Sequence, residues 1–477
     1  MAIANIVVTV VDVGQGQCTF VEVYDTTPAL IHTLLFDCGT NHRSPSEGIN
    51  LDYIVAKVSG MATPAFDCIF FSHSDTDHTN LTANLLLKFT PAKKPTVKKV
   101  WYGGDRDHYT VIVGSDLFNI LDYLVANNYC LTTDIFSPDP DKTDYADPNT
   151  WTGTLWKTGD GTTNVQVYSL IANVLKTTPE TPVTGTPPRK RRKVAEAANR
   201  VSIVCGLYYA GASYVICGDA TNKTMATINT AFVNGTTFFD NNHMTTAPHH
   251  GSRKTGFAVP SSAKASATTA KNVTDFAALV KSRTMTLSVY DHHKHPSLEL
   301  VNSFIPTITS PFLKDTRFTP NTHRIVLFNN TNNSIVLVDG SGTKLYNDYY
   351  GFDTPTCTFS TWYSRFTYNT YKLGEALVGP YSALVTPLTA INPNACWRYE
   401  ISADGSWSVG GYANLSLPLA IFTGATTTSV AGMAAVTAET KTTEQEASAI
   451  EIKRSIQKPR PPAQMVPQFR RRLKQFH

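Results

Sequence analysis

The stretch FFSHSDTDHTN, residues 70–80, places two histidines and two aspartates within a few positions of one another, directly after an apolar run. The preceding segment DCIFFS, residues 67–72, has the length and composition of a buried strand. Polar loops that follow the strands of open α/β sheets are the places where such folds bind ligands. Imidazoles and carboxylates bind divalent cations, so we predict a metal site formed by His73, Asp75, Asp77 and His78.

A plain capping turn is the alternative interpretation of this loop. Ser74, Asp75 and Asp77 all have side chains that cap the first turn of a helix. Such a turn accounts for one aspartate, but not for a second aspartate and two histidines in the same loop. The pattern therefore favours metal binding over capping.

Strands and helices alternate along the first third of the chain and resume after the 174–200 segment, which is typical of an α/β fold. Alternation and β-branched runs predict strands at 6–13, 18–24, 33–39, 67–72, 201–211, 213–220 and 285–290. Helical spacing predicts helices at 78–89 and 115–128.

Composition divides the chain into three parts. Residues 1–343 form the predicted α/β domain, interrupted at 174–200 by a Thr/Pro-rich and then basic insertion that we expect to be flexible. Residues 344–424 are rich in aromatic residues, Thr and Gly in short alternating runs, which predicts a small β-rich appendage. Residues 425–477 have the composition of a disordered basic tail.

Length and cysteine usage place limits on the class of protein. No apolar run approaches the roughly 20 residues of a membrane-spanning helix, so we expect no membrane span. The eight cysteines form no CxxC pair and mostly lie in apolar runs, which favours buried thiols in a reducing compartment over a structural cysteine zinc site. We therefore expect a cytoplasmic protein.

Positive charge is concentrated in two short segments, although the whole chain carries a net charge of only +4. The acidic remainder of the chain lacks the basic character that binders of polyanions usually carry. Contact with nucleic acid is one interpretation of both segments, and a solvated run of charge without a partner is the other. The first segment also resembles a nuclear-import signal, which would apply in a eukaryotic or viral source. The candidate contact residues are Arg189, Lys190, Arg191, Arg192 and Lys193 in the first segment and Arg470, Arg471 and Arg472 in the second.

HSDTDH resembles the HxHxDH signature of the metallo-β-lactamase superfamily, with Asp75 in the place of a histidine. Other segments match the family pattern in the same order: TLLFDCG ends on Asp37, YVICGDA supplies Asp219, and APHHGS supplies His249 and His250. The opening VVDVGQGQCTFVEV and the later HKHPS resemble the soluble hydrolase domain of ComEC-type competence proteins. The resemblance covers about residues 5–340.

The resemblance implies a four-layer αββα sandwich with one or two divalent metal ions at its edge. By resemblance, His73 and Asp75 would join one metal, Asp77 and His78 would hold the second, and Asp219 would bridge them. One of His249 and His250 would be a further ligand while the other contacts substrate or packs; we assign His249 to the metal and His250 to catalysis, and the sequence does not separate the two. Asp37 would orient a ligand histidine from behind.

Two further histidines have weaker interpretations. His295, in HKHPS, would donate a proton to a leaving oxygen or contact a phosphate, or would only cap a helix. His108, in GGDRDHY, is a candidate for the middle histidine that Asp75 replaces, but a polar surface loop explains it better.

The aspartate at position 75 bears on the choice of metal. A carboxylate in place of an imidazole makes the site harder and more negative, which favours Mn²⁺ or Mg²⁺ over Zn²⁺. We therefore expect Mn²⁺ to be preferred, with Zn²⁺ or Mg²⁺ as alternatives.

Three functions follow from these observations. The first is a metal-dependent phosphodiesterase, specifically a nuclease in which a metal-bound hydroxide attacks and Asp77 takes part. The second is a small-molecule hydrolase of the same fold acting on a cyclic nucleotide, thioester or lactone, and the third is a binding module with a degenerate site. The expected partner is a nucleic acid or nucleotide substrate, and the appendage or tail could bind a protein.

Overall fold

The computed structural model describes residues 2–43, 47–104, 116–138, 154–158, 164–174, 199–233, 237–259, 265–288, 300, 303–304, 325–329, 334–338, 376–377, 396–414 and 417–425. All of them lie in one compact unit that spans residues 1–427. The tail predicted at 425–477 lies outside the described residues apart from its first position.

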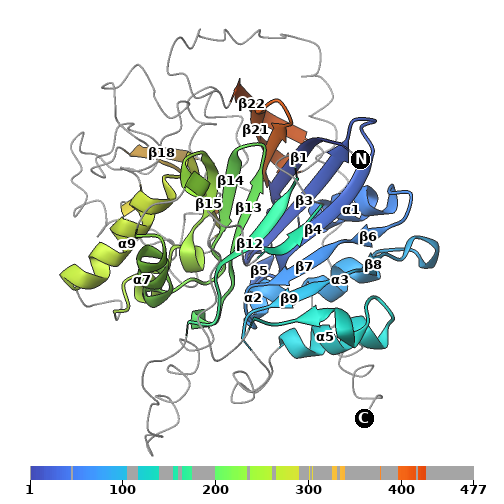
Figure 1. The fold of residues 1–477 in the computed structure, drawn as a ribbon, viewed down its shortest axis with the longest axis horizontal. Helices are drawn as coiled ribbons and strands as arrows, with labels where there is room; N and C mark the ends of the chain where they lie inside the picture. The colour runs from blue at the N-terminus through green and yellow to red at the C-terminus, as the bar shows by residue number, and fades with distance from the viewer. Residues whose placement is uncertain are drawn as a thin grey trace, which may run out of the picture. The chain divides into compact units, whose positions relative to one another are not determined.

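Two large sheets form the body of this unit (Figure 1). The first sheet has the order β10 (Ile135–Phe136), β9 (Val100–Tyr102), β7 (Cys68–Phe71), β4 (Leu30–Cys38), β3 (Cys18–Asp25), β1 (Ile3–Val10), β20 (Cys396–Ser402), β21 (Ser406–Asn414) and β22 (Leu417–Ala425). The second has the order β11 (Thr154–Lys157), β12 (Gln166–Ile171), β13 (Val204–Tyr209), β14 (Ala212–Ile216), β15 (Asn242–Thr246), β16 (Thr284–Ser288) and β19 (Ala376–Leu377). Short pairs join β2 (Gly14–Gln15) to β5 (His42–Arg43), β6 (Ala65–Phe66) to β8 (Thr96–Val97), and β17 (Ile325–Asn329) to β18 (Ser334–Val338).

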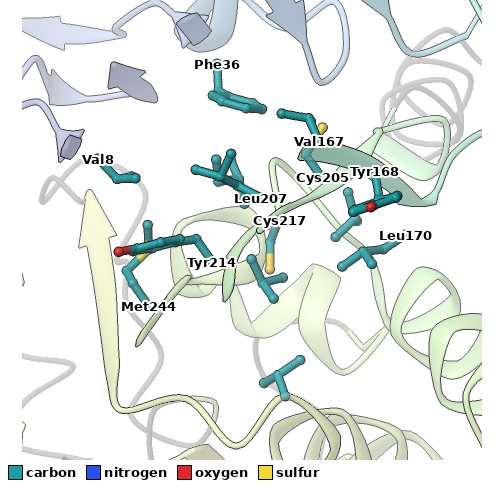
Figure 2. Packing of buried hydrophobic residues seen from close by; sticks show 14 of the residues in the cluster. Val8, Phe36, Val167, Tyr168, Leu170, Cys205, Leu207, Tyr214, Cys217 and Met244 are labelled. Atoms are coloured by element: carbon teal, nitrogen blue, oxygen red, sulfur yellow. The ribbon is translucent and has the colours of Figure 1, made fainter. Parts of the chain in front are cut away.

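Alternating side chains in the strands of the first sheet supply two different cores. Phe36 and Phe70 stack with ring centroids 4.5 Å apart and belong to the core that includes side chains of the second sheet. Their neighbours Leu35 and Ile69 belong to a separate core with residues of the helices. Figure 2 shows the first of these cores, where Val8 and Phe36 lie opposite Leu207 and Val167. The strands are apolar on both faces because both faces are covered.

Helices cover the outer surface of each sheet (Figure 1). The first sheet packs against α1 (Glu47–Ser59), α3 (Thr82–Leu87) and α5 (Asp116–Ala126). The second packs against α7 (Asn222–Ala231) and α9 (Ala267–Val280), which also contact each other. Short helices occur at α2 (Thr76–Thr79), α8 (Arg253–Gly256), and as 3-10 turns at Pro91–Lys93, Thr132–Asp134, Thr237–Phe239 and Pro248–Gly251. This four-layer αββα arrangement confirms the predicted fold class.

The described strands of residues 344–424 do not form a sheet of their own. β20 pairs antiparallel with β1, in register from Asn5 opposite Ser402 to Val10 opposite Trp397, and β21 and β22 continue the same sheet. Without β20, β1 would expose an unpaired row of backbone donors and acceptors at the sheet edge. The C-terminal strands therefore complete the first sheet.

The single helix predicted over 78–89 is wrong, because the chain forms α2 and α3 with a break at Asn80 and Leu81. The side chain of Asn80 accepts from the backbone N–H of Thr40 at 2.9 Å and donates to its carbonyl at 2.8 Å. The backbone N–H of Leu81 donates to the carbonyl of Cys38 at 2.9 Å. These bonds tie the segment to the end of β4 and interrupt the helical hydrogen bonding.

No helix among the described residues is long and apolar enough to cross a membrane. The seven described cysteines are buried and free, and Cys357 lies outside the described residues.

His243 makes the stability of the fold depend on pH. It is buried beside the rings of Tyr214 and Trp407, and burial together with the nearby Arg283 lowers its pKa to about 3. The unfolded chain binds a proton at His243 near pH 6.5, whereas the folded chain does not, so stability is lost as the pH falls from about 6.5 towards 3. At pH 5 we expect a loss of about 2 kcal/mol from this group.

Urea unfolding of the wild type and of His243→Phe, at pH 7.5 and pH 5, measures this contribution. The other titrating histidines are common to both proteins, so the difference between the two pH dependences isolates His243. An equal loss of stability on acidification in both proteins would exclude this role.

Candidate metal centre

The candidate site lies where strands of both sheets end at their carboxyl termini. β7 pairs in parallel with β4, and β14 pairs in parallel with β15. The loop 72–75 follows β7, Asp219 follows β14, and the turn at Pro248–Gly251 follows β15. Parallel pairing brings the loops of each sheet to one edge of that sheet. Contacts of His78 with Asp219 and of Asp77 with His250 show that the two edges lie together.

One oxygen of Asp219 faces a compact set of side chains. Its Oδ1 lies 3.1 Å from Nε2 of His78 and 3.6 Å from Nε2 of His250. The same nitrogen of His250 lies 3.4 Å from Oδ2 of Asp77. Asp77, His78 and His250 thus form a buried group whose ligand atoms all lie within 4.8 Å of one another.

The other oxygen of Asp219 faces a more open set. Its Oδ2 lies 3.1 Å from Nδ1 of His249 and 3.4 Å from Nε2 of His73. The same nitrogen of His73 lies 3.5 Å from Oδ2 of Asp75, whose side chain is 37% exposed. Asp219 therefore stands between two groups of potential ligands, one on each carboxylate oxygen.

The donor atoms of this cluster fit a divalent cation. The buried atoms Nε2 of His73, His78 and His250 and Oδ1 of Asp219 make no hydrogen bond. Unpaired buried polar atoms are costly, and four of them converging on one place require an explanation. Ligands that each lie about 2.1 Å from one ion are roughly 3.0–3.4 Å apart, which is close to the separations observed here. Imidazole nitrogens and carboxylate oxygens are ligands of Mn²⁺ and Zn²⁺.

The electrostatics of the cluster also favour a cation. Burial and the neighbouring His78 oppose the charged form of His73, but the carboxylates of Asp219 and Asp75 outweigh them and raise its pKa to about 9. Burial likewise opposes the charged form of His78, yet Asp219 and Asp37 raise its pKa well above the usual value. Burial opposes ionisation of Asp219, but the surrounding imidazoles hold its pKa well below the usual range. The carboxylates attract positive charge that a divalent cation would supply.

Backbone strain is concentrated at the site. His249 and His250 have φ values of 45° and 51°, so two successive non-glycine residues adopt left-handed conformations. Each such residue costs on the order of 1 kcal/mol, and strain of this kind is typical of functional sites. The turn is held by the backbone N–H of His249, which donates to the carbonyl of Gly218 at 3.0 Å. The strained turn directs the two imidazoles to opposite oxygens of Asp219.

Asp37 lies behind His78 and outside both ligand groups. The register between β3 and β4 shifts at this point, and Asp37 has a φ of 52°, which is typical of a β-bulge that redirects a side chain. Its Oδ2 lies 2.8 Å from Nδ1 of His78. A residue that orients a ligand histidine would make such a contact, and this role of Asp37 stays a prediction.

The capping interpretation of the loop receives no support at Asp75. Asp75 occupies the N-cap position of α2, but its side chain makes no capping hydrogen bond. Its carboxylate faces His73 instead.

The structure adds two residues that the sequence does not reveal. Ser72 contacts both His73 and His78 from behind, and Asn199 contacts Nδ1 of His249 through its side-chain amide nitrogen at 2.9 Å. Ser72 could have been suspected because it is a polar residue immediately before the motif. Asn199 is fifty positions from His249, so the sequence gives no indication of their contact.

Several predicted site residues lie outside the described part of the chain. They are His108, His295, the basic run Arg189, Lys190, Arg191, Arg192 and Lys193, and the C-terminal Arg470, Arg471 and Arg472.

No protein-family model and no curated protein matches this chain. Among solved structures it is similar to an unliganded yeast PDE1, with 11% identity and a TM-score of 0.30 over 59% of this chain and 84% of that one. It is also similar to a diphosphatase from the PhnP family, with 11% identity and a TM-score of 0.27 over 59% of this chain and 85% of that one. The topology of the chain itself is a four-layer αββα sandwich with a His/Asp cluster at its edge. The likeness to ComEC-type domains stays a prediction.

Proposed function

We propose that this chain is a metal-dependent phosphodiesterase that acts on nucleic acid. The observation that carries the proposal is the position of Asp219, with one oxygen towards His78 and His250 and the other towards His73 and His249. Two ligand groups that share a bridging carboxylate suit a pair of divalent ions, which would activate water and stabilise the charge on a phosphoryl group. Phosphodiesters are the substrates that such paired sites commonly hydrolyse.

The residues of the chain have separable roles in this proposal. Asp77, His78 and His250 would hold one ion, and His73 and Asp75 the other, with Asp219 between them. The grouping of His250 with Asp77 favours metal binding for this histidine over the catalytic role assigned from sequence. His249 is 19% exposed, more than the other three imidazoles, so it is the one best placed to meet substrate as well.

The basic insertion supports nucleic acid as the substrate class. Its run of five cationic residues at 189–193 ends shortly before Asn199, whose side chain contacts His249. At the other end, the backbone N–H of Val174 donates to the carbonyl of Arg200 at 3.1 Å, so the two described ends of the segment lie together. The segment that contains the basic run therefore begins and ends at described residues beside His249. The acidic remainder of the chain favours a small substrate instead, which makes a small-molecule hydrolase the second candidate.

One experiment separates these functions. The protein is stripped with a chelator, reloaded with Mn²⁺, and incubated with single- and double-stranded DNA, RNA, a cyclic dinucleotide, a lactone and a thioester. Cleavage of nucleic acid that is lost with the chelator supports the proposal, and turnover of only a small substrate supports the alternative. A folded protein that binds Mn²⁺ and hydrolyses none of them would be a binding module.

Metal preference is expected to follow position 75. The wild type should be more active with Mn²⁺ than with Zn²⁺, because Asp75 is a hard oxygen ligand. Asp75→His should shift the activity ratio towards Zn²⁺ by about tenfold or more, since it supplies a nitrogen ligand and removes a negative charge. Asp75→Asn controls for loss of charge alone. A wild type that prefers Zn²⁺, or an unchanged ratio in Asp75→His, would contradict this assignment.

Neutralising the basic run at 189–193 with glutamine is expected to weaken DNA binding and flatten its dependence on salt. Each cation that neutralises a phosphate releases counterions, so losing five contacts reduces the magnitude of the slope of log affinity against log salt by up to about 4.5 on duplex DNA. Turnover of a short dinucleotide substrate should be unchanged. Removing residues 451–477 tests the second basic segment separately. Unchanged affinity and slope in both proteins would show that the two segments are solvated charge.

A further inference from the structure

Ser72 lies at the centre of a hydrogen-bonded group behind the metal centre. Its Oγ lies 2.8 Å from Oδ2 of Asp37, 3.0 Å from Nδ1 of His73 and 3.2 Å from Nδ1 of His78. The same Oδ2 of Asp37 lies 2.8 Å from Nδ1 of His78. All four side chains are buried. One hydroxyl therefore contacts the rear nitrogens of both histidines of the HSDTDH motif.

The protons of this group can be assigned by counting donors and acceptors. A carboxylate only accepts hydrogen bonds, so the contact between Ser72 and Asp37 uses the single hydroxyl proton of the serine. The serine oxygen can then only accept, which requires a proton on Nδ1 of His73. Asp37 accepts in the same way from Nδ1 of His78. In the neutral form that binds a cation, each imidazole would therefore carry its proton on Nδ1 and present the lone pair of Nε2 on the side of Asp219.

The backbone around Ser72 keeps the hydroxyl in place. The N–H of Ser72 donates to Oδ1 of Asp37 at 2.7 Å, and its carbonyl accepts from Ile203 at 3.0 Å. A Cβ atom added at Gly103 would lie 2.2 Å from the carbonyl oxygen of Ser72, and one added at Gly218 would lie 2.5 Å from its Cβ. Ser72 is therefore enclosed on several sides, and its side chain has little room to rotate.

We propose that Ser72 is a positioning residue that, together with Asp37, sets the tautomer of both His73 and His78 for cation binding. Of these two histidines, Asp37 directly contacts His78. Ser72 lies between Asp37 and His73 and hydrogen bonds with both. A histidine that binds a metal commonly donates its other N–H to a carboxylate or carbonyl, and loss of that contact typically costs 10- to 100-fold in affinity or activity. Here Ser72 would supply this contact for His73, while Asp37 supplies it for His78.

The inference rests on the proposed metal centre, so the test first measures binding of Mn²⁺ and Zn²⁺ to the wild type by competition with a chelator. Ser72→Ala is expected to weaken binding by about 10- to 100-fold. Ser72→Ala combined with Asp37→Asn should lose less than the product of the two single effects, because both act through one group. Ser169→Ala is the matched control, since Ser169 is also a buried serine, lies in β12, and has a hydroxyl that makes no hydrogen bond.

A spectroscopic readout separates positioning from general packing. In Zn²⁺-loaded wild type with ¹⁵N-labelled histidine, NMR should show a protonated Nδ1 for both His73 and His78. In Ser72→Ala, the signal of the Nδ1 proton should be lost for His73 before it is lost for His78. Should Ser72→Ala fail to fold, Ser72→Cys keeps a similar volume with a weaker acceptor and is expected to give an intermediate affinity. A wild type that binds no cation would overturn the proposed function. Cation binding by the wild type with unchanged affinity and tautomers in Ser72→Ala would overturn this inference alone.

Discussion

Asp219→Asn is expected to abolish activity, with a fall in kcat of at least about 10³-fold, because it removes the group shared by both ligand sets. The two oxygens of Asp219 lie 3.1–3.6 Å from four imidazoles, two on each side. Asparagine keeps one oxygen and replaces the other with an amide that can only donate, so it can serve one side at most. It also removes the negative charge that offsets the imidazoles and a bound cation.

Metal content measured by mass spectrometry, alongside hydrolysis of a phosphodiester substrate, checks this expectation. We expect the purified variant to hold fewer ions per chain than the wild type while its circular dichroism stays unchanged. Asp52→Asn is the control, because Asp52 is an exposed aspartate paired with Lys88 away from the cluster. Near-normal turnover by folded Asp219→Asn would show that the bridging assignment is wrong.

The sequence was sufficient to predict the fold class and the position of the cluster. His73, Asp75, Asp77 and His78 are adjacent in the chain, so one strand followed by one loop brings them together. Asp37 and Asp219 were expected from the resemblance of TLLFDCG and YVICGDA to the family pattern, and both lie beside His78 in the structure.

Contacts between distant positions could not be predicted in this way. The bonds between Ser72 and Asp37 and between Asn199 and His249 depend on how separate loops pack, and nothing in the local pattern of either residue encodes its partner. The pairing of β20 with β1 could not be predicted for the same reason. From its sequence alone, β20 belongs to a separate β-rich region. Local helical spacing failed at Asn80 for a related reason, because hydrogen bonds to Thr40 and Cys38 outweigh helix propensity there.

The sequence also could not predict which of His249 and His250 faces which oxygen of Asp219. Both imidazoles follow the same strand, and only the strained backbone of the turn decides which oxygen of Asp219 each one faces. Two adjacent histidines with ordinary extended backbone would point in opposite directions, and the left-handed pair instead directs both into the cluster.

Gly39→Ala is expected to disrupt the metal centre although residue 39 carries no ligand. A Cβ atom at this position would lie 2.4 Å from the backbone nitrogen of Thr79 and 2.5 Å from that of His78, closer than real Cβ atoms come to any atom. The chain at 77–79 would have to move away from β4, and Asp77 and His78 would move with it. Displacements of about 1 Å at a catalytic site can cost 10²-fold in rate, so we expect a loss of kcat of at least about that size, with weaker metal binding.

The stability of the same variant is expected to fall by about 1–3 kcal/mol, because the overlap involves backbone atoms that cannot rotate aside. Gly48→Ala is the matched control: a Cβ atom at Gly48, in the first turn of α1, meets no atom within 4 Å. That control should keep its metal affinity and gain up to about 1 kcal/mol, since alanine loses less conformational entropy in a helix than glycine. Urea unfolding and chelator competition on both variants measure the two effects. If Gly39→Ala bound cations as tightly as Gly48→Ala, the close approach of Gly39 to α2 would not be what positions Asp77 and His78.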